Sequence, residues 1–145
     1  MLYFCIKKSM DTRIKPSENG NTPFGKLLGH NTAILQAWDE LGDVLFGKSG
    51  LDAVLLEQVR RTLAHGNKCE YCMAKGEPNK VIIDKRESYA TAFAELFVLD
   101  HLSISDAHFD VLREVFTDAE ISSLCAFISF MTASQRFGAV LNLQP

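Results

Sequence analysis

The sequence lacks the features that mark several broad classes of protein. It has no basic excess, since 15 Lys and Arg are set against 18 Asp and Glu for a net charge of −3. Nucleic-acid binding rests on a concentrated basic surface, so this balance argues against a nucleic-acid partner. No apolar run reaches the about 20 residues that span a bilayer, and we predict no membrane partner. The apolar start, MLYFCIKK, is too short for a signal peptide, so we predict a cytoplasmic location.

Cysteines are few, and only two of them are closely spaced. Four cysteines among 145 residues do not make the dense pattern of a secreted disulfide framework. Cys69 and Cys72 form the single C-x-x-C pair, whereas structural zinc needs four ligands and usually two such pairs. The four histidines are scattered along the chain. We therefore predict no metal and no cofactor.

No repeat or low-complexity tract divides the chain, and its length fits one domain. The stretch KPSENGNTPFG is rich in proline, glycine and polar turn-forming residues. We therefore predict an N-terminal arm over residues 1–29 and a single helical domain over residues 30–145.

Helical spacing of apolar residues dominates this domain. It predicts an all-α fold with helices over 31–46, 49–66, 86–102, 105–116 and 117–141. A shorter helix would start after its cap Asn67 and end before Pro78, and VIIDK could form an isolated strand. Asn31 or Thr32, Ser105 and the Thr117-x-x-Glu120 capping box support the other starts. The expected fold is a bundle of about six helices whose surplus apolar surface suits an oligomer.

The C-x-x-C pair is the strongest functional signal. Three residues apart at a helix start, Cys69 and Cys72 lie on one face and can approach disulfide distance. A helix N-terminus favours negative charge and so lowers the pKa of a thiol. We interpret the pair as redox-active; the alternatives are a chance pair in a helix and part of a metal site.

Other candidates surround the pair. Glu57 has an ordinary explanation as the ion-pair partner of Arg61 at i, i+4. If its helix packs as a hairpin with the cysteine turn, Glu57 is also a candidate general base. His65, in a last helical turn, complements the helix dipole or acts catalytically. We interpret Cys125 as a small core residue on an apolar face, and Cys5 in the arm is unplaced.

The arrangement Glu57…Cys69-Glu-Tyr-Cys72 resembles the carboxymuconolactone decarboxylase family, specifically its alkylhydroperoxidase D-like branch. The resemblance covers about residues 22–145. It includes TPFGKLLGHNTAILQAWDELGDVLF upstream of the pair and ISDAHFDVLREVFTDAEISSLCAFISFMTASQRFGAVL downstream. It implies an all-α, alkylhydroperoxidase D-like bundle that assembles as a homo-oligomer, as a dimer, trimer or hexamer.

The resemblance also implies a peroxidase. Cys72 would attack a hydroperoxide and Cys69 would resolve it as a disulfide, which an external dithiol then reduces. Glu57 matches the glutamate that starts the proton relay of the family. That relay ends on a histidine four residues after the second cysteine, where this chain has Gly76. Tyr71 stands where one family member has a histidine between the cysteines.

Glycine cannot accept or pass a proton, so three arrangements remain open. Glu57 acts directly or through water, Tyr71 or His65 substitutes, or the cysteines are weakly activated in a slow peroxidase or thiol–disulfide partner. General-base help is worth about 10²–10⁴-fold, which sets the scale of the loss. Two other functions stay open: a non-enzymatic redox-sensing or oligomeric module, and a lactone decarboxylase. The C-x-x-C counts against the decarboxylase, because those relatives do not depend on it.

Overall fold

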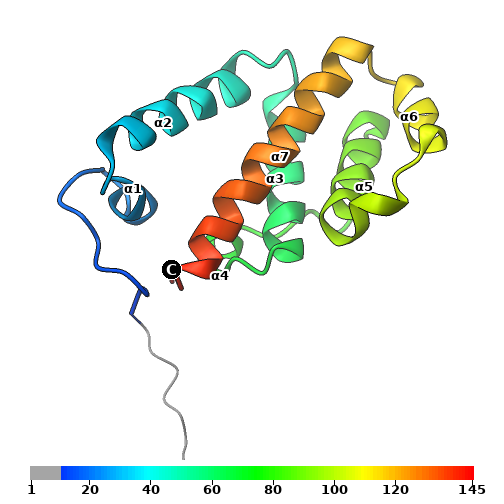
Figure 1. Ribbon diagram of the computed structural model, residues 1–145. Helices are drawn as coiled ribbons and strands as arrows, with labels where there is room; N and C mark the ends of the chain where they lie inside the picture. The colour runs from blue at the N-terminus through cyan, green and yellow to red at the C-terminus, as the bar shows by residue number, and fades with distance from the viewer. Residues whose placement is uncertain (1–10) are drawn as a thin grey trace, which may run out of the picture.

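The computed structural model describes residues 11–145, and over this range the chain forms helices and no strand. The prediction of an all-α bundle is therefore confirmed, with seven α-helices and one 3-10 helix in place of about six (Figure 1). Their bounds are α1 Pro23–Leu28, α2 Thr32–Gly47, α3 Ala53–Gly66, α4 Glu70–Met73, α5 Lys85–Asp100, η1 His101–Ser103, α6 Asp106–Arg113 and α7 Asp118–Val140. Cys5 lies outside the described residues.

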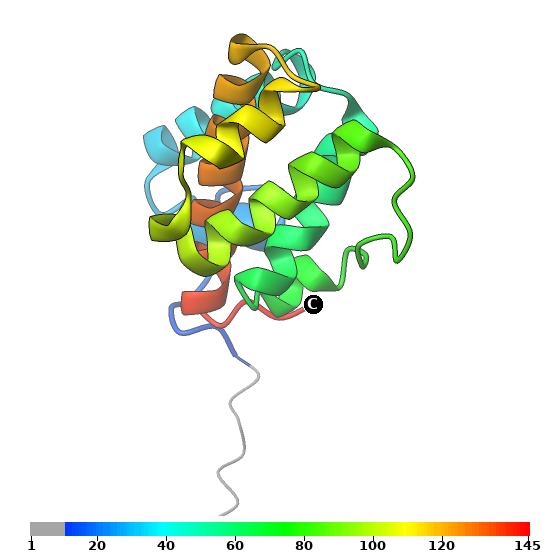
Figure 2. The ribbon, with the colours of Figure 1, turned by 90° about the vertical axis from the view of Figure 1, so that its right-hand side faces the viewer.

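The core forms where α3 packs against both α5 and α7, as the two ribbon views show (Figures 1 and 2). Each helix contributes a stripe of apolar side chains that are almost fully removed from water. This burial is the main driving force for folding. The stripes include Leu55, Leu56, Val59 and Leu63 of α3, Ala90, Phe93 and Ala94 of α5, and Leu124, Phe127 and Ile128 of α7.

Three predicted helix starts are confirmed by their caps. The Asn31 side chain accepts N–H bonds from the first turn of α2, and Ser105 is the N-cap of α6. Thr117 and Glu120 form the capping box of α7, in which each side chain binds the backbone N–H of the other residue. Such caps satisfy N–H groups that a helix leaves unpaired at its start.

The connection between α3 and α4 differs from the prediction. Asn67 is the C-cap of α3 and does not start the next helix; Cys69 is the N-cap of α4. The left-handed residue that ends the helix is Lys68, with φ 53°, and Gly66 stays helical. The Asn67 amide is instead engaged by α7, donating to the Gln135 side chain over 2.9 Å.

Three further segments differ from the sequence pattern. Helix α3 was predicted to start at Ser49, but its N-cap is Asp52, three residues later. The VIIDK segment forms no strand, because no neighbouring strand offers its backbone a partner within the described chain; its Asp84 is the N-cap of α5 and its Lys85 the first residue of that helix. The short helix α1 lies inside the segment expected to be an arm, where the Thr22 side chain caps it.

Helix α2 lies at the periphery, beside α1 and α7 (Figure 1). Of the apolar side chains of α2 only Leu45 is buried, while Ile34 and Leu41 stay exposed. The Trp38 indole N–H donates to Ser134 of α7 over 3.0 Å and fixes the helix there. No single helix of residues 11–145 is long and apolar enough to cross a membrane; α6 and α7 reach that length and composition only as a pair bent by 118°.

Candidate active site

Cys69 is the N-cap of the single-turn helix α4, and Cys72 lies within that turn. The Cys69 sulfur accepts the backbone N–H of Cys72 over 3.3 Å and so acts as the N-cap of this short helix. The two cysteines are joined as a disulfide in the structure. The predicted proximity of the two cysteines is therefore a feature of the structure.

The two sulfur atoms have different surroundings. Cys69 is 0% exposed, and its sulfur lies behind α7, where a Cβ atom at Gly138 would come within 3.6 Å of it. Cys72 is only partly buried and lines a cavity of about 240 Å³. A molecule entering from solvent can therefore reach Cys72, whereas Cys69 is covered by the protein.

The cavity beside Cys72 is lined by both polar and apolar side chains. The polar ones include Arg60, Tyr71, Lys75 and Gln135. The remainder includes Phe24 from α1, Phe46 from α2 and Met131 from α7. The Lys75 ammonium lies 4.5 Å from the centre of the Tyr71 ring, a favourable cation–π contact. Helices distant in sequence therefore meet at the reachable cysteine.

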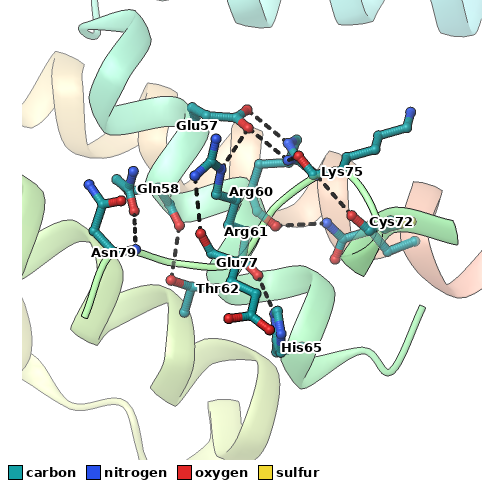
Figure 3. A network of polar contacts seen from close by, with 11 residues as sticks. Glu57, Gln58, Arg60, Arg61, Thr62, His65, Cys72, Lys75, Glu77 and Asn79 are labelled. Atoms are coloured by element: carbon teal, nitrogen blue, oxygen red, sulfur yellow. Dashed lines mark hydrogen bonds and ion pairs between the residues drawn. The ribbon is translucent and has the colours of Figure 1, made fainter. Parts of the chain in front are cut away.

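Glu57 is held by two arginines of its own helix (Figure 3). Its Oε1 accepts from Arg61 Nε at 2.9 Å, which confirms the predicted i, i+4 pair. Arg60 binds the same carboxylate in bidentate fashion, at 2.8 and 2.7 Å. The Arg60 hydrogen bonds, helped by those of Arg61, lower the pKa of Glu57 to about 2. At neutral pH this carboxylate is ionised and has little affinity for a proton.

The same turn of α3 also forms hydrogen bonds with the loop that follows the cysteines (Figure 3). Arg60 donates to the carbonyl oxygens of Cys72 and Lys75, at 3.3 and 3.4 Å. Arg61 donates to the carbonyl of Glu77 at 3.0 Å, and the Gln58 side chain accepts the N–H of Asn79 at 2.9 Å. We call Gln58, Arg60 and Arg61 the α3 clamp. It fixes the loop 72–79 on both sides of its turn.

Gly76, at the place of the missing histidine, belongs to this loop. Its φ of 130° is one that side-chain-bearing residues rarely adopt. A Cβ atom at this position would lie 3.0 Å from the guanidinium carbon of Arg61, tighter than nine in ten real contacts. The Arg61 guanidinium therefore occupies the space beside Gly76, and a side chain at this position would require it to shift.

The two substitutes for that histidine lie in different places. Tyr71 lines the cavity of Cys72. His65 is exposed at the end of α3, with its ring nitrogen 3.1 Å from the Arg61 carbonyl, and borders a separate hollow of about 590 Å³ that contains neither cysteine. Of the two, Tyr71 is therefore the side chain beside the reachable sulfur.

The other titratable candidates lie away from the pair. Cys125 packs against the core, and burial raises the pKa of its thiol. His101 is exposed, whereas His108 is half-buried and accepts the backbone N–H of Ser105 at the start of α6. Among the described residues, no group of three or more His, Cys, Asp or Glu side chains is arranged to hold a metal ion.

Comparison with known proteins agrees with this architecture. No protein-family model and no curated protein matches the sequence. A solved structure of an uncharacterised peroxidase-related protein from Silicibacter sp. TM1040 is similar, with a TM-score of 0.74, 22% identity, and 83% of this chain and 74% of that chain covered. A second similar structure is that of an uncharacterised peroxidase-related protein from Ralstonia eutropha JMP134, described as an alkylhydroperoxidase AhpD core. Its TM-score is 0.70 and its sequence identity 23%, and the match covers 83% of this chain and 74% of that chain. The chain has an alkylhydroperoxidase D-like fold.

Within this fold, Arg60 is the site residue that sequence reasoning missed. It is only 8% exposed, although it is charged. Its position carries a signal, because it lies four residues after the buried Leu56 and three before the buried Leu63. A charged residue at the edge of an apolar helix stripe needs buried partners, since an unpaired charge is costly to remove from water.

Proposed function

We propose that the protein is a thiol-dependent peroxidase that reduces hydroperoxides through Cys69 and Cys72. The observation that carries this proposal is the bonded pair itself, in which one sulfur lines a cavity and the other is covered. The peroxidase-related descriptions of the two similar structures agree with it. Cys72 then takes the attacking role and Cys69 the resolving role.

The chemistry balances in three steps. The Cys72 thiolate attacks the terminal oxygen of a hydroperoxide, so that an S–O bond forms, the O–O bond breaks, and an alkoxide leaves and is protonated to an alcohol. The Cys69 thiol then attacks the sulfenic acid, forming the disulfide and releasing water. An external dithiol finally supplies two electrons and two protons and restores both thiols. We keep the cytoplasm as the predicted compartment, where such reductants are found.

Glu57 is the third residue of the proposed site. Its carboxylate is occupied by Arg60 and Arg61, so it supports the site by orienting Arg60. The role of general base, which we also predicted for Glu57, would require its release from both arginines. A second candidate function follows from this occupancy: a redox sensor that oxidises once without turning over.

We also propose that the protein is a homo-oligomer. The exposed apolar side chains of α2, Ile34, Leu41, Val44 and Phe46, support this, because a second copy would remove them from water. The number of copies follows only from the resemblance stated above.

A direct experiment measures removal of hydrogen peroxide and tert-butyl hydroperoxide with dithiothreitol as electron donor. We expect Cys72→Ser to lower the rate to the protein-free background, and the matched Cys125→Ser variant to retain it. If Cys72→Ser removes peroxide as fast as the unaltered protein, the proposal is wrong. Loss of free thiols after peroxide, without turnover in the presence of dithiothreitol, would identify the sensor instead.

A further inference from the structure

Arg60 is a buried cation on the wall of the cavity that Cys72 lines. A guanidinium carries five N–H groups. Two of those of Arg60 bind Glu57, one binds the Cys72 carbonyl and one binds the Lys75 carbonyl. Within residues 11–145 the fifth, on Nη1, has no partner. Nη1 therefore has one N–H left that can donate to an acceptor from outside the chain.

We propose that Arg60 is a catalytic residue, whose guanidinium stabilises the Cys72 thiolate and donates its free N–H to the hydroperoxide oxygen that leaves. This inference rests on the proposed peroxidase function and adds the group that replaces the missing relay. It requires no side-chain base. The thiol proton goes to solvent when Cys72 ionises, and the leaving alkoxide takes a proton back from solvent, so Arg60 keeps all its protons throughout.

The charges around Cys72 favour this role. On α3, Arg60 and Arg61 outweigh Glu57, leaving one net positive charge on this turn. The loop after α4 adds Lys75 to the cavity lining, where Tyr71 is the other titratable group besides Cys72 among residues 11–145. Glu70 and Glu77 are exposed and do not line the cavity. The wall residues from α1, α2 and α7 carry no charge. A cation close to a thiol favours its ionised form.

The geometry also suits the charge that develops in the reaction. When the O–O bond breaks, negative charge moves onto the leaving oxygen, and a preformed N–H donor stabilises that oxygen more than the neutral peroxide. The bidentate bond from Glu57 prevents the guanidinium from turning, because both Nε and Nη2 are fixed. A donor held in this way needs no reorganisation when the charge appears.

Arg61 provides a matched control within the same turn. It carries the same charge, binds the same Glu57 carboxylate and contacts the same loop, through the Glu77 carbonyl. It does not line the cavity of Cys72. Replacing either arginine therefore removes one positive charge and its contacts to the loop, but only Arg60 lines the cavity that Cys72 also lines.

The test uses the full chain in a Cys69→Ser background, where the serine hydroxyl keeps an N-cap oxygen and Cys72 is the only thiol of the pair. Three variants are added: Arg60→Met, Arg60→Lys and Arg61→Met. The pKa of Cys72 comes from the pH dependence of its alkylation, read on the separated peptide. The second measurement is the single-turnover rate of sulfenic acid formation with tert-butyl hydroperoxide. Far-ultraviolet circular dichroism checks the fold of each variant.

We expect Arg60→Met to raise the pKa of Cys72 and to slow its oxidation about 10²-fold, the scale for loss of one preorganised donor. Arg60→Lys keeps the positive charge but loses the planar set of N–H donors. It should therefore preserve the pKa of Cys72 and still slow the oxidation of Cys72. Arg61→Met should have an effect at least about fivefold smaller on the rate. If Arg61→Met matches Arg60→Met in both measurements, the inference is wrong.

Two further outcomes are decisive. If Arg60→Met does not fold, Arg60→Lys carries the test, and unchanged oxidation in that variant overturns the role of the fifth N–H. If the unaltered protein turns over no peroxide, the proposed function fails. The alkylation measurement involves no peroxide, so it still tests whether Arg60 stabilises the Cys72 thiolate. An unchanged pKa of Cys72 in Arg60→Met overturns that role.

Discussion

The two faces of α3 make different kinds of contact: one packs in the core, and the other forms hydrogen bonds. One face presents Leu55, Leu56, Val59 and Leu63 to α5 and α7, and these side chains are at most 1% exposed. The other presents Glu57 and the α3 clamp to the cysteine loop through directed hydrogen bonds. Apolar packing is non-directional and fixes the helix in the bundle, whereas the hydrogen bonds fix individual carbonyl oxygens. A single helix therefore couples the position of the dithiol to the core.

The largest effect should come from the apolar face. Leu56→Ala removes a side chain that is 0% exposed, and we expect it to lower the free energy of unfolding by about 2–5 kcal/mol. Urea unfolding measures this loss. Val54→Ala, on the same helix but 56% exposed, is the control and should change stability by less than about 0.5 kcal/mol. A similar cost for both would mean that the apolar face does not hold α3 in place.

An intermediate effect should come from the loop that the clamp holds. Gly76→Ala forces a side chain into an unfavourable φ of 130° and against the Arg61 guanidinium, which should cost about 1–3 kcal/mol. Gly50→Ala is the control, because Gly50 also has a positive φ but nothing lies near the added Cβ atom. Urea unfolding of both should show the larger loss at Gly76. Equal losses would show that Arg61 does not press on this turn.

The smallest effect should come from the carboxylate between the arginines. The pKa of Glu57 is about 2 in the folded protein and 4.5 ordinarily, so its contribution to stability is complete above pH 4.5 and is lost as the pH falls towards 2. Because the side chain is 37% exposed, we expect about 1 kcal/mol or less. Urea unfolding at pH 6 and pH 3 should show a larger loss for the unaltered protein than for Glu57→Gln. The same loss in both would contradict the ion-paired state.

The apolar face of α3 could be predicted from the sequence because its spacing repeats with the helical period. The polar face could be predicted only in part. The spacing of Glu57 and Arg61 predicts an i, i+4 pair, and this pair is present at 2.9 Å. The bonds of Arg60 and Arg61 to the carbonyls of residues 72, 75 and 77 join separate segments, and no local pattern encodes them.

The cysteine turn shows the same division. The C-x-x-C spacing predicts that the sulfurs meet, but not which of them is covered. Cys69 is covered because α7, about 70 residues further along the chain, runs behind it at Gly138. The prediction that Asn67 caps α4 was wrong for a related reason. Asparagine is a common N-cap residue, but here its side-chain amide donates to Gln135 of α7.

The covered position of Cys69 has a kinetic meaning. In the oxidised protein an incoming reductant can attach only to Cys72, with Cys69 as the leaving thiol, because the sulfur of Cys69 is shielded. Under the proposed function, peroxide and reductant therefore react in alternation at the same sulfur, that of Cys72. Such an enzyme follows a double-displacement scheme, in which each substrate reacts with the form of the enzyme that the other substrate has left.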